Sequence, residues 1–309
     1  MRRRSLLAAG LALSLPRPAA AADKLTVILD WFINANHESL FAAQYCGDYA
    51  RAGLDVRFIA PADPSSPPRL LAAGQADLAV SYQTELPFLA ARGLPVVRVA
   101  TLLDQPLEVL MTLPGYGIRK LADFKGRSIG VAVGPGEDAQ LDAMLDSAGL
   151  KPNDVRRVQV NFQVEQALMS HSVDAVMGGM RNYELIDLRQ RGLSPIAFRP
   201  EQHGVPPYDE LILLARRDNA ASPKIARFLA ALRVGTARLQ ADPGFVWRKF
   251  AAAHPDLDTR LNRAAWTATL PMLPADPAHL DLTRYETLQR FLVAYGALRD
   301  AVPVATYVR

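Results

Sequence analysis

The 309-residue chain contains a single cysteine, Cys46, so it cannot form a disulfide bond within itself. Its five histidines are scattered through the chain without the spacing of a metal site. They are His37, His171, His203, His254 and His279. No arrangement of serine, histidine and aspartate indicates a nucleophilic catalytic site either. We therefore expect no metal ligand, no cofactor and no catalytic residue.

The N-terminal segment has the layout of a secretory signal peptide. Arg2, Arg3 and Arg4 form a charged start, and Leu6–Leu15 is an apolar run too short for the ~20 residues of a membrane-spanning helix. Ala19–Ala22 supplies the small residues of a cleavage site. We predict that residues 1–22 are removed and that the protein is periplasmic. The pair Arg3-Arg4 fits a twin-arginine signal or a basic Sec signal, and both alternatives stay open.

The chain has no net positive charge once this segment is set aside. Residues 1–22 hold four arginines and no acidic residue, so the formal charge of +4 falls to zero without them. A chain with no excess of basic residues gives no support for a nucleic-acid partner. Cys46 lies well past the cleavage site, so no cysteine is placed for lipidation. We expect a soluble mature protein that does not insert into the membrane.

Short apolar runs alternate with helical stretches along the remaining chain. The predicted strands are 25–29, 54–59, 78–81, 95–102, 127–133, 155–160, 173–177, 195–198 and 209–215. The predicted helices are 39–50, 68–73, 84–91, 138–147, 164–170, 182–191, 222–240, 244–253, 260–270 and 282–298. Ser222-Pro223 is typical of a helix start. This alternation predicts an α/β fold with mostly parallel sheets.

The alternation occurs as two similar series. Gly53-Leu54 is followed by Asp77-Leu78, 24 residues after the glycine, and Gly149-Leu150 by Asp174-Ala175 at a spacing of 25. We predict lobe 1 at 23–106 and 210–309, and lobe 2 at 112–203. Hinge crossings at 107–111 and 204–209 would join the lobes. A small-molecule ligand is expected in the cleft between the lobes, with hinge closure around the ligand.

One segment is specific enough to indicate a family. Asp30-Trp31-Phe32-Ile33-Asn34-Ala35-Asn36-His37 resembles the D-W-F-P-N-T-N-H signature of bacterial proteins that bind thiamine-pyrimidine precursors for ABC transport. That group is homologous to the thiamine pyrimidine synthases of fungi. The resemblance extends through Ser81-Tyr82-Gln83 and Gly134-Pro135-Gly136-Glu137, and thins in the C-terminal helices. Ile33 and Ala35 depart from the signature's proline and threonine.

The resemblance implies a periplasmic-binding-protein type II fold and a receptor function. The expected ligand is hydroxymethylpyrimidine or its formylamino precursor, and the expected partner is an ABC transporter permease that receives the ligand from a monomeric protein. A receptor for another small heterocycle, a sulfonate or a carboxylate is the alternative within the binding class.

The residues of the signature are the first candidates for ligand contacts. Trp31 follows a buried strand, where its flat face can stack on a pyrimidine or pack in the core. Asn34 and Asn36 can bond to the edge of a heterocycle, and Asn36 is equally suited to cap the following helix. His37 is either a ligand contact or a satisfied residue of the first helical turn.

Further candidates follow the ends of later strands. Ser81, Tyr82 and Gln83 lie at the carboxyl end of one strand, with Tyr82 as a second stacking wall or a packing residue. Tyr183 and Glu184 hold the matching place in the second series and either reach across the cleft or face solvent. Tyr208 lies at the return crossing.

The turn from Gly134 to Glu137 joins a strand to a helix. Gly134 and Gly136 leave backbone N–H groups exposed, which can cradle an anion. The turn matches no established phosphate fingerprint, and Glu137 places a carboxylate where a phosphate would sit. We therefore expect Glu137 to accept a hydrogen bond from an exocyclic amine.

The homologous synthases raise the alternative of an enzyme that uses pyridoxal phosphate and iron. The cofactor lysine of those enzymes falls on Ser81 and the donor histidine on Glu85. Without a lysine amine no Schiff base can form there. Their cysteine-rich run would lie near His203–Leu211, which has no cysteine. The sequence thus favours a binding protein over an enzyme.

Overall fold

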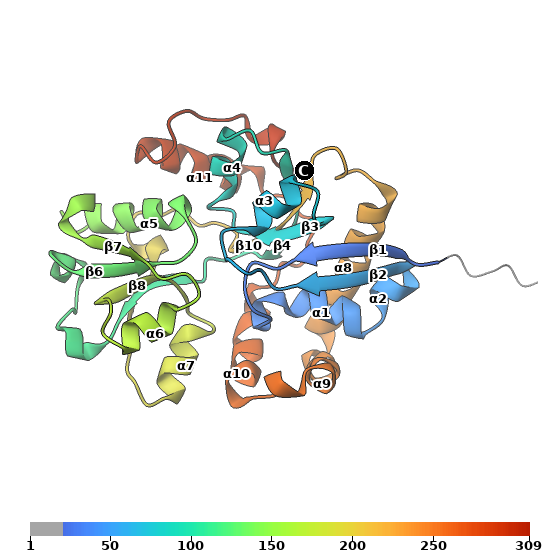
Figure 1. Cartoon of the computed structure of the whole chain (residues 1–309), viewed down its shortest axis with the longest axis horizontal. Helices are drawn as coiled ribbons and strands as arrows, with labels where there is room; N and C mark the ends of the chain where they lie inside the picture. The colour runs from blue at the N-terminus through green and yellow to red at the C-terminus, as the bar shows by residue number, and fades with distance from the viewer. Residues whose placement is uncertain (1–20) are drawn as a thin grey trace, which may run out of the picture.

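The structure, a computed structural model, describes residues 21–309 (Figure 1). The predicted signal peptide therefore lies, apart from its last two residues, outside the described residues. The strands are β1 Asp23–Ile28, β2 Leu54–Ile59, β3 Leu78–Ser81, β4 Val96–Leu103, β5 Glu108–Thr112, β6 Ser128–Val131, β7 Arg156–Gln159, β8 Ala175–Met180, β9 Ile196–Phe198 and β10 Leu211–Arg216. The helices are α1 Glu38–Tyr45, α2 Asp48–Arg51, α3 Pro67–Ala72, α4 Leu86–Ala91, α5 Pro135–Asp146, α6 Val164–Met169, α7 Glu184–Gln190, α8 Pro223–Ala241, α9 Pro243–Ala253, α10 Arg260–Thr269 and α11 Leu282–Ala294.

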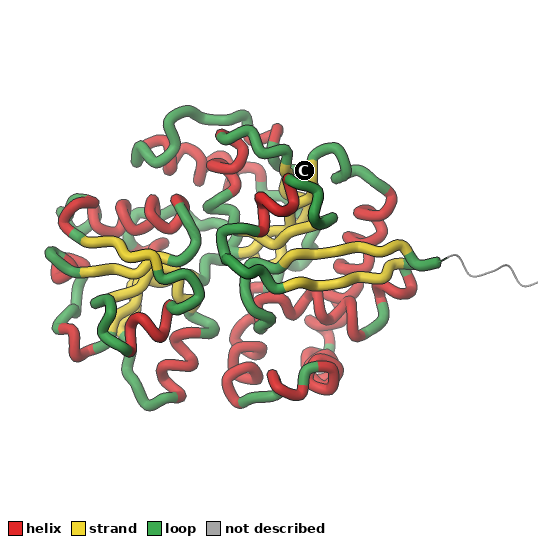
Figure 2. Tube along the Cα trace, in the orientation of Figure 1, coloured by secondary structure: helices red, strands yellow, loops and turns green. Residues whose placement is uncertain are grey.

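These elements form an α/β protein of two lobes, each built on its own five-stranded sheet within the described residues (Figure 2). The strand order is β2-β1-β3-β10-β4 in the sheet of lobe 1 and β7-β6-β8-β5-β9 in the sheet of lobe 2. In lobe 1, β1 pairs in parallel with β2 and β3, and β10 pairs antiparallel with β3 and β4. In lobe 2, β6 pairs in parallel with β7 and β8, and β5 pairs antiparallel with β8 and β9. The two lobes therefore repeat one topology, as the paired spacing in the sequence predicts.

The antiparallel pairs correct one detail of the predicted fold class. Each sheet has as many antiparallel pairs as parallel ones among the described residues, so neither is mostly parallel. The reason is that β5 and β10 enter their sheets directly after a crossing between the lobes. Strand β5 lies beside β8 and strand β10 beside β3, and both pairs are antiparallel.

The crossings lie partly outside the predicted hinge segments. The chain passes from lobe 1 to lobe 2 between Leu103 and Glu108, and it returns between Phe198 and Leu211. Most of the segment predicted as the first hinge, 107–111, is strand β5, so lobe 2 begins at Glu108 rather than at residue 112. The buried side chains of Val109, Leu110 and Met111 explain the difference, because they pack in the core of lobe 2.

One predicted helix is divided in two. The segment 39–50 contains α1 and α2, separated at Gly47, whose φ of 78° is in the left-handed region. A glycine adopts this conformation at little cost, so the chain turns here before the second helix begins. The predicted cap at Ser222 is present, because its hydroxyl accepts a hydrogen bond of 3.3 Å from the N–H of Ile225.

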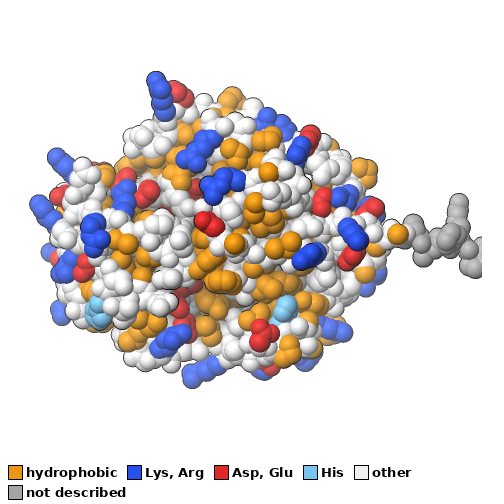
Figure 3. Space-filling view, viewed as in Figure 1, with side chains coloured by type: hydrophobic (Ala, Val, Ile, Leu, Met, Phe, Trp, Pro, Cys, Tyr) orange, Lys and Arg blue, Asp and Glu red, His pale blue; other side chains and the backbone are white. Residues whose placement is uncertain are grey.

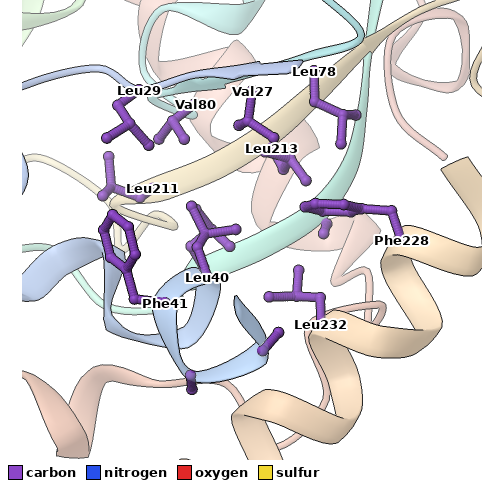
Figure 4. Close-up of a cluster of buried hydrophobic side chains, with 14 of the residues drawn as sticks. Val27, Leu29, Leu40, Phe41, Leu78, Val80, Leu211, Leu213, Phe228 and Leu232 are labelled. Atoms are coloured by element: carbon purple, nitrogen blue, oxygen red, sulfur yellow. The ribbon is translucent and has the colours of Figure 1, made fainter. Parts of the chain in front are cut away.

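Lobe 1 packs helices on both faces of its sheet. Leu211 and Leu213 of β10 face α1 and α8, whereas Ile212 and Leu214 face α3, α4 and α11. Figure 4 shows the first of these layers, in which side chains of β1, β3 and β10 meet Leu40, Phe41, Phe228 and Leu232. Helices α1 and α8 approach closely at Gly235, where an added Cβ would lie 2.5 Å from the backbone nitrogen of Ala43.

Candidate functional site

The candidate site is a cavity between the two lobes, where the carboxyl ends of strands from both sheets meet. Its walls come from the segments that follow β1 and β3 of lobe 1 and from β5, β8 and the segments after β6 and β8 of lobe 2. With the lobes in this arrangement the cavity volume is ≈ 20 Å³. Figure 3 shows acidic side chains in the hollow between the two halves of the molecule. The lining residues are Asp30, Trp31, Asn34, Asn36, Tyr82, Glu108, Val133, Gly178, Met180, Tyr183 and Glu184.

The two lobes are closed on each other around this cavity. Met180 of lobe 2 packs in the apolar core of lobe 1, and Trp31 of lobe 1 packs against the core of lobe 2. The side-chain amide of Asn182, in lobe 2, donates hydrogen bonds to Asn36 Oδ1 at 2.6 Å and to Thr269 Oγ1 at 2.7 Å in lobe 1. These polar contacts are buried and hold the lobes together at one end of the cavity.

Trp31 forms one wall of the cavity. Its ring is half-buried and meets the ring of Phe162, in lobe 2, edge to face, with centroids 4.5 Å apart and planes at 73°. Tyr183, also half-buried, lines the cavity from lobe 2. Burial raises the pKa of the Tyr183 phenol to about 12, with further contributions from Glu184 and Glu165, so the phenol is a neutral hydrogen-bonding group.

Asp30 is held in place by two side chains. It accepts a hydrogen bond from the Tyr82 hydroxyl at 2.7 Å, and its other oxygen lies 2.8 Å from Nε2 of His37. The N–H of Asn34 donates to Nδ1 of His37 at 3.4 Å, so Nδ1 is an acceptor and Nε2 carries the proton that it donates to Asp30. His37 is fully buried, with both ring nitrogens used. It orients Asp30 and does not line the cavity.

The two asparagines of the signature have different local roles. Asn34 caps the 3-10 helix Ala35–His37, because its Oδ1 accepts from the N–H of Asn36 at 2.8 Å and its amide donates to Phe32 O at 3.0 Å. Asn36 also suits a cap by its place in the sequence, but the residue that caps this helix is Asn34. Asn36 lines the cavity and accepts the bond from Asn182.

The three candidates at the end of β3, Ser81, Tyr82 and Gln83, have side chains in different places. Tyr82 lines the cavity and also an adjoining one, which Ser81 lines as well. Gln83 is fully buried, and its side-chain oxygen accepts from the N–H of Asp209 at 2.6 Å, so it connects β3 to the return crossing. Among the sequence candidates in this segment, the structure therefore brings only Tyr82 into the central cavity.

The glycine turn after β6 is filled by a side chain of the opposite lobe. Glu85 Oε1 accepts a hydrogen bond of 2.7 Å from the N–H of Gly136. A Cβ added at Gly134 would lie 2.9 Å from Glu85 Oε2. Burial raises the pKa of Glu85 to about 7, although the Gly136 N–H and Arg92 act in the opposite direction. The exposed N–H group that suggested an anion cradle thus binds the protein's own carboxyl group.

Glu137 is not among the residues that line the cavity. Its Oε2 accepts from the N–H of Ala132 at 2.7 Å, and its Oε1 is buried beside Gly178, which does line the cavity. Burial raises its pKa to about 8. In contrast, Glu184 lines the cavity, accepts from the N–H of Met180 at 2.7 Å, and has a pKa raised by burial to about 7.

Tyr208 is not among the residues that line the cavity. Its side chain is fully buried in an apolar cluster with Phe88, Leu288 and Phe291. The sequence placed it at the return crossing, which is where it lies, but the crossing segment turns this ring into the core rather than toward the cleft.

Five lining residues were not among the candidates: Asp30, Glu108, Val133, Gly178 and Met180. Glu108 is the most informative of them. It is 2 % exposed, and its Oε2 accepts from the amide of Gln140 at 2.7 Å. Burial and the neighbouring Glu210 and Glu137 raise the pKa of Glu108 well above its ordinary value. An acidic residue inside the apolar run Leu107–Met111 was the sequence signal for it.

The comparison with known proteins places these features in a family. A model of the family described as "NMT1/THI5 like" matches residues 34–244. The chain belongs to the NMT1/THI5-like family. It is 42% identical, over 96% of its length and 94% of the relative, to a Haemophilus influenzae protein named for thiamine biosynthesis.

Further relatives are named for binding or for synthesis. A formylaminopyrimidine-binding protein of Halalkalibacterium halodurans is 35% identical over 63% of this chain and 59% of that protein. A 4-amino-5-hydroxymethyl-2-methylpyrimidine phosphate synthase of Uromyces fabae is 27% identical over 82% of this chain and 78% of the enzyme.

Solved structures share the fold. The alkanesulfonate-binding protein of Xanthomonas axonopodis has a TM-score of 0.74 at 20% identity, over 94% of this chain and 99% of that one. At this identity the likeness concerns the fold alone, which is that of periplasmic binding proteins. None of the helices within 21–309 is long and apolar enough to cross a membrane.

The cavity does not fit the cofactor chemistry of the synthases. Ser81, which takes the place of the synthase lysine, carries a hydroxyl group and is 2 % exposed. No lysine is among the described residues that line the central cavity or the adjoining one. Residues 21–309 also contain no cluster of three or more side chains suited to a metal ion.

Proposed function

We propose that this protein is the extracytoplasmic solute-binding component of an ABC importer. Its ligand is a thiamine pyrimidine precursor, hydroxymethylpyrimidine or formylaminopyrimidine, bound between the two lobes. The observation that carries the proposal is a cavity closed by both lobes, with an aromatic wall at Trp31 and carboxyl groups at Asp30, Glu108 and Glu184. The export signal in the sequence and the likeness to a formylaminopyrimidine-binding protein support the same function.

The aromatic wall suits a flat heterocycle. A pyrimidine stacked on Trp31 gains roughly 0.5–1.5 kcal/mol beyond the burial of its surface. Tyr82 and Tyr183 line the same cavity and bound the space beside the ring. Hydroxymethylpyrimidine and its formylamino relative share the ring and differ only in one substituent, so both fit this argument.

The carboxyl groups suit the amino group of such a pyrimidine. An exocyclic amine donates two hydrogen bonds, and the acidic residues Asp30, Glu108 and Glu184 line the cavity. No lysine or arginine is among the described residues that line it, so a sulfonate or carboxylate would meet carboxyl groups and no cationic partner. This composition favours an aminopyrimidine over the anionic ligands of the alternative receptor function.

The partner follows from the same proposal. A protein exported by its N-terminal signal reaches the periplasm, where a monomeric receptor delivers its ligand to a membrane permease. Closure of the lobes on the ligand would create the surface that the permease recognises.

A binding assay on the mature protein tests the proposal. Titration calorimetry with hydroxymethylpyrimidine and with formylaminopyrimidine is expected to give a Kd of about 1 μM, equivalent to about −8.2 kcal/mol. At 100 times Kd the ligand stabilises the folded protein by about 2.7 kcal/mol, which a melting curve detects. An alkanesulfonate serves as the competing candidate. Binding of the sulfonate with no response to either pyrimidine would refute the ligand assignment.

Substitution of Trp31 tests the stacking wall. Trp31→Ala should raise the Kd for hydroxymethylpyrimidine at least tenfold while the protein stays folded. Trp247, half-buried in α9 and remote from the cavity lining, provides the matched control. Equal affinity in Trp31→Ala and Trp247→Ala would show that the indole does not contact the ligand.

A further inference from the structure

The central cavity adjoins a second, wider compartment at the edge of the cleft. The two spaces share Trp31, Asn34, Tyr183 and Glu184 as walls. The second space, here called the outer compartment, has a volume of ≈ 410 Å³ and is open to solvent. Its other walls include Phe32 of lobe 1 and Phe162 and Glu165 of lobe 2. A substituent on a ring stacked at Trp31 therefore has a direct path into the outer compartment.

Aromatic rings from both lobes gather at the outer compartment. Phe162 lies between the rings of Trp31 and Phe32, at centroid distances of 4.5 and 4.6 Å. Phe32 is 54% exposed, the highest exposure of any large apolar side chain in the described residues. An exposed aromatic side chain at the mouth of a cavity is characteristic of a ligand-contacting surface.

The same compartment carries an excess of carboxyl groups. Burial, together with the nearby carboxyl groups of Glu184 and Asp187, raises the pKa of Glu165 to about 9. Glu165 Oε1 is buried and has no hydrogen-bond partner. Arg191 is the cationic side chain at this wall, and it pairs with Asp187 at 2.6 Å. Within the described residues Glu165 and Glu184 form no ion pair, although the charge of Arg191 acts on Glu165.

We propose that the outer compartment binds a positively charged substituent of the ligand, such as an alkylammonium group on the pyrimidine ring. The proposal rests on the proposed function, because it extends the ligand of the central cavity by one group. Aromatic faces attract a cation through their quadrupole, and the contribution of each is about 0.5–2 kcal/mol depending on desolvation. A cation would also form an ion pair with Glu165 once that carboxyl group releases its proton, which neither a neutral nor an anionic substituent can do.

Two pyrimidines of nearly equal size provide the test. Hydroxymethylpyrimidine ends in a neutral hydroxyl, and the corresponding aminomethylpyrimidine ends in an ammonium group. By calorimetry at pH 7 and low salt, we expect the ammonium compound to bind at least tenfold more tightly, a difference of about 1.4 kcal/mol. Because Glu165 is protonated at pH 7 without ligand, binding of the cation should also release protons, seen by repeating the titration in buffers of different ionisation enthalpy.

Glu165→Gln keeps the shape of the side chain and removes its charge. In this variant the preference for the ammonium compound should fall below about threefold, with the affinity for hydroxymethylpyrimidine unchanged. Glu286→Gln, on the exposed face of α11, removes a charge elsewhere and should keep the full preference. Equal affinities for the two pyrimidines in the native protein, or a preference that survives Glu165→Gln, would overturn the cation site and leave the proposed function standing.

A second probe separates the two proposals if neither pyrimidine binds. Benzylammonium and benzyl alcohol differ in the same way but carry no pyrimidine. A melting temperature raised by millimolar benzylammonium, but not by benzyl alcohol or in Glu165→Gln, would support the cation site although the pyrimidine assignment had failed. No response to benzylammonium in that case would overturn the cation site as well.

Discussion

Glu85 of lobe 1 reaches across the cleft and accepts a hydrogen bond from the N–H of Gly136 at the start of α5 in lobe 2. The N-terminus of this helix carries partial positive charge, so a carboxyl group is a favourable partner for it. The contact exists only while the lobes are closed. The hydrogen bond between Glu85 and Gly136 thus links the two lobes directly, without a contact from the ligand.

Gly136→Ala should impair closure. The added Cβ would lie 2.5 Å from Glu85 Oε1 and 2.9 Å from the backbone carbonyl carbon of Thr84, so the closed lobes have no room for it. Because α5 itself tolerates alanine, the stability of the unliganded protein should change little. We expect the Kd for hydroxymethylpyrimidine to rise at least tenfold in a calorimetric titration. Gly115→Ala, which places its Cβ in open space, is the control, and equal affinity in the two variants would contradict the close approach.

The stability of the folded protein should fall as the pH rises from 5 to 8.5. The pKa values of Glu85, Glu184 and Glu210 are raised to about 7 and that of Glu137 to about 8, chiefly by burial, above the ordinary value of 4.5. Each group binds its proton more tightly in the folded than in the unfolded chain. Its contribution is complete below pH 4.5 and is lost as the pH passes through 7 to 8. Melting curves across this range measure the effect.

Glu137→Gln provides the matched variant for this pH dependence. Glutamine keeps an oxygen for the N–H of Ala132 and removes the titrating group. We expect the fall in melting temperature between pH 5 and 8.5 to become smaller by about 2–4 °C, equivalent to about 1 kcal/mol for a protein of this size. A pH profile identical to that of the native protein would show that Glu137 does not bind the proton.

Asn182 should be more important for binding than for folding. Its amide bridges Asn36 and Thr269 of the other lobe, and Asn182→Ala leaves these polar groups unpaired when the lobes close. A lost buried hydrogen bond of about 1–2 kcal/mol corresponds to a Kd for hydroxymethylpyrimidine raised about 5- to 30-fold. Asn153→Ala, exposed on lobe 2, is the control. If both variants bound ligand as the native protein does, the bridge would have no part in closure.

The hydroxyl and the ring of Tyr82 should contribute to different properties. Tyr82→Phe removes the hydrogen bond to Asp30 and should lower the free energy of unfolding by about 1–3 kcal/mol, measured by urea denaturation. It keeps the ring that lines the cavity, so ligand affinity should stay within about threefold. Tyr82→Ala removes the ring and should weaken binding more than tenfold. Equal losses of affinity in the two variants would mean that the hydroxyl group itself contacts the ligand.

The fold was largely predictable because the strands and helices of its core have recognisable local sequence patterns. Runs of apolar residues bounded by glycine or aspartate predicted β2 and β3 with the bounds that the structure gives, Leu54–Ile59 and Leu78–Ser81. The exception is β5, a buried strand that directly follows a crossing. Periodicity cannot tell such a short apolar run from a connecting segment.

The candidate site was predictable only in part, because its geometry depends on long-range contacts. The family signature located Trp31, Asn34 and Asn36, and the matching strand ends located Tyr82, Tyr183 and Glu184. The partner of the glycine turn could not be found in this way, since Glu85 is 51 residues from Gly136 along the chain. Glu108 was missed for a similar reason. Only the folded chain shows that its buried carboxyl faces a cavity.

The interleaving of the two sheets also determines the order in which the lobes can be assembled. Strands β5–β9 are continuous in the chain, so lobe 2 can complete its sheet as soon as residue 198 has been made. Lobe 1 cannot, because β10 lies between β3 and β4 and follows them by more than a hundred residues. Pairing over such a separation is slow to form. Lobe 2 is therefore expected to fold first. Once folded, it would bring the two parts of lobe 1, which are distant in the sequence, close enough for their strands to pair.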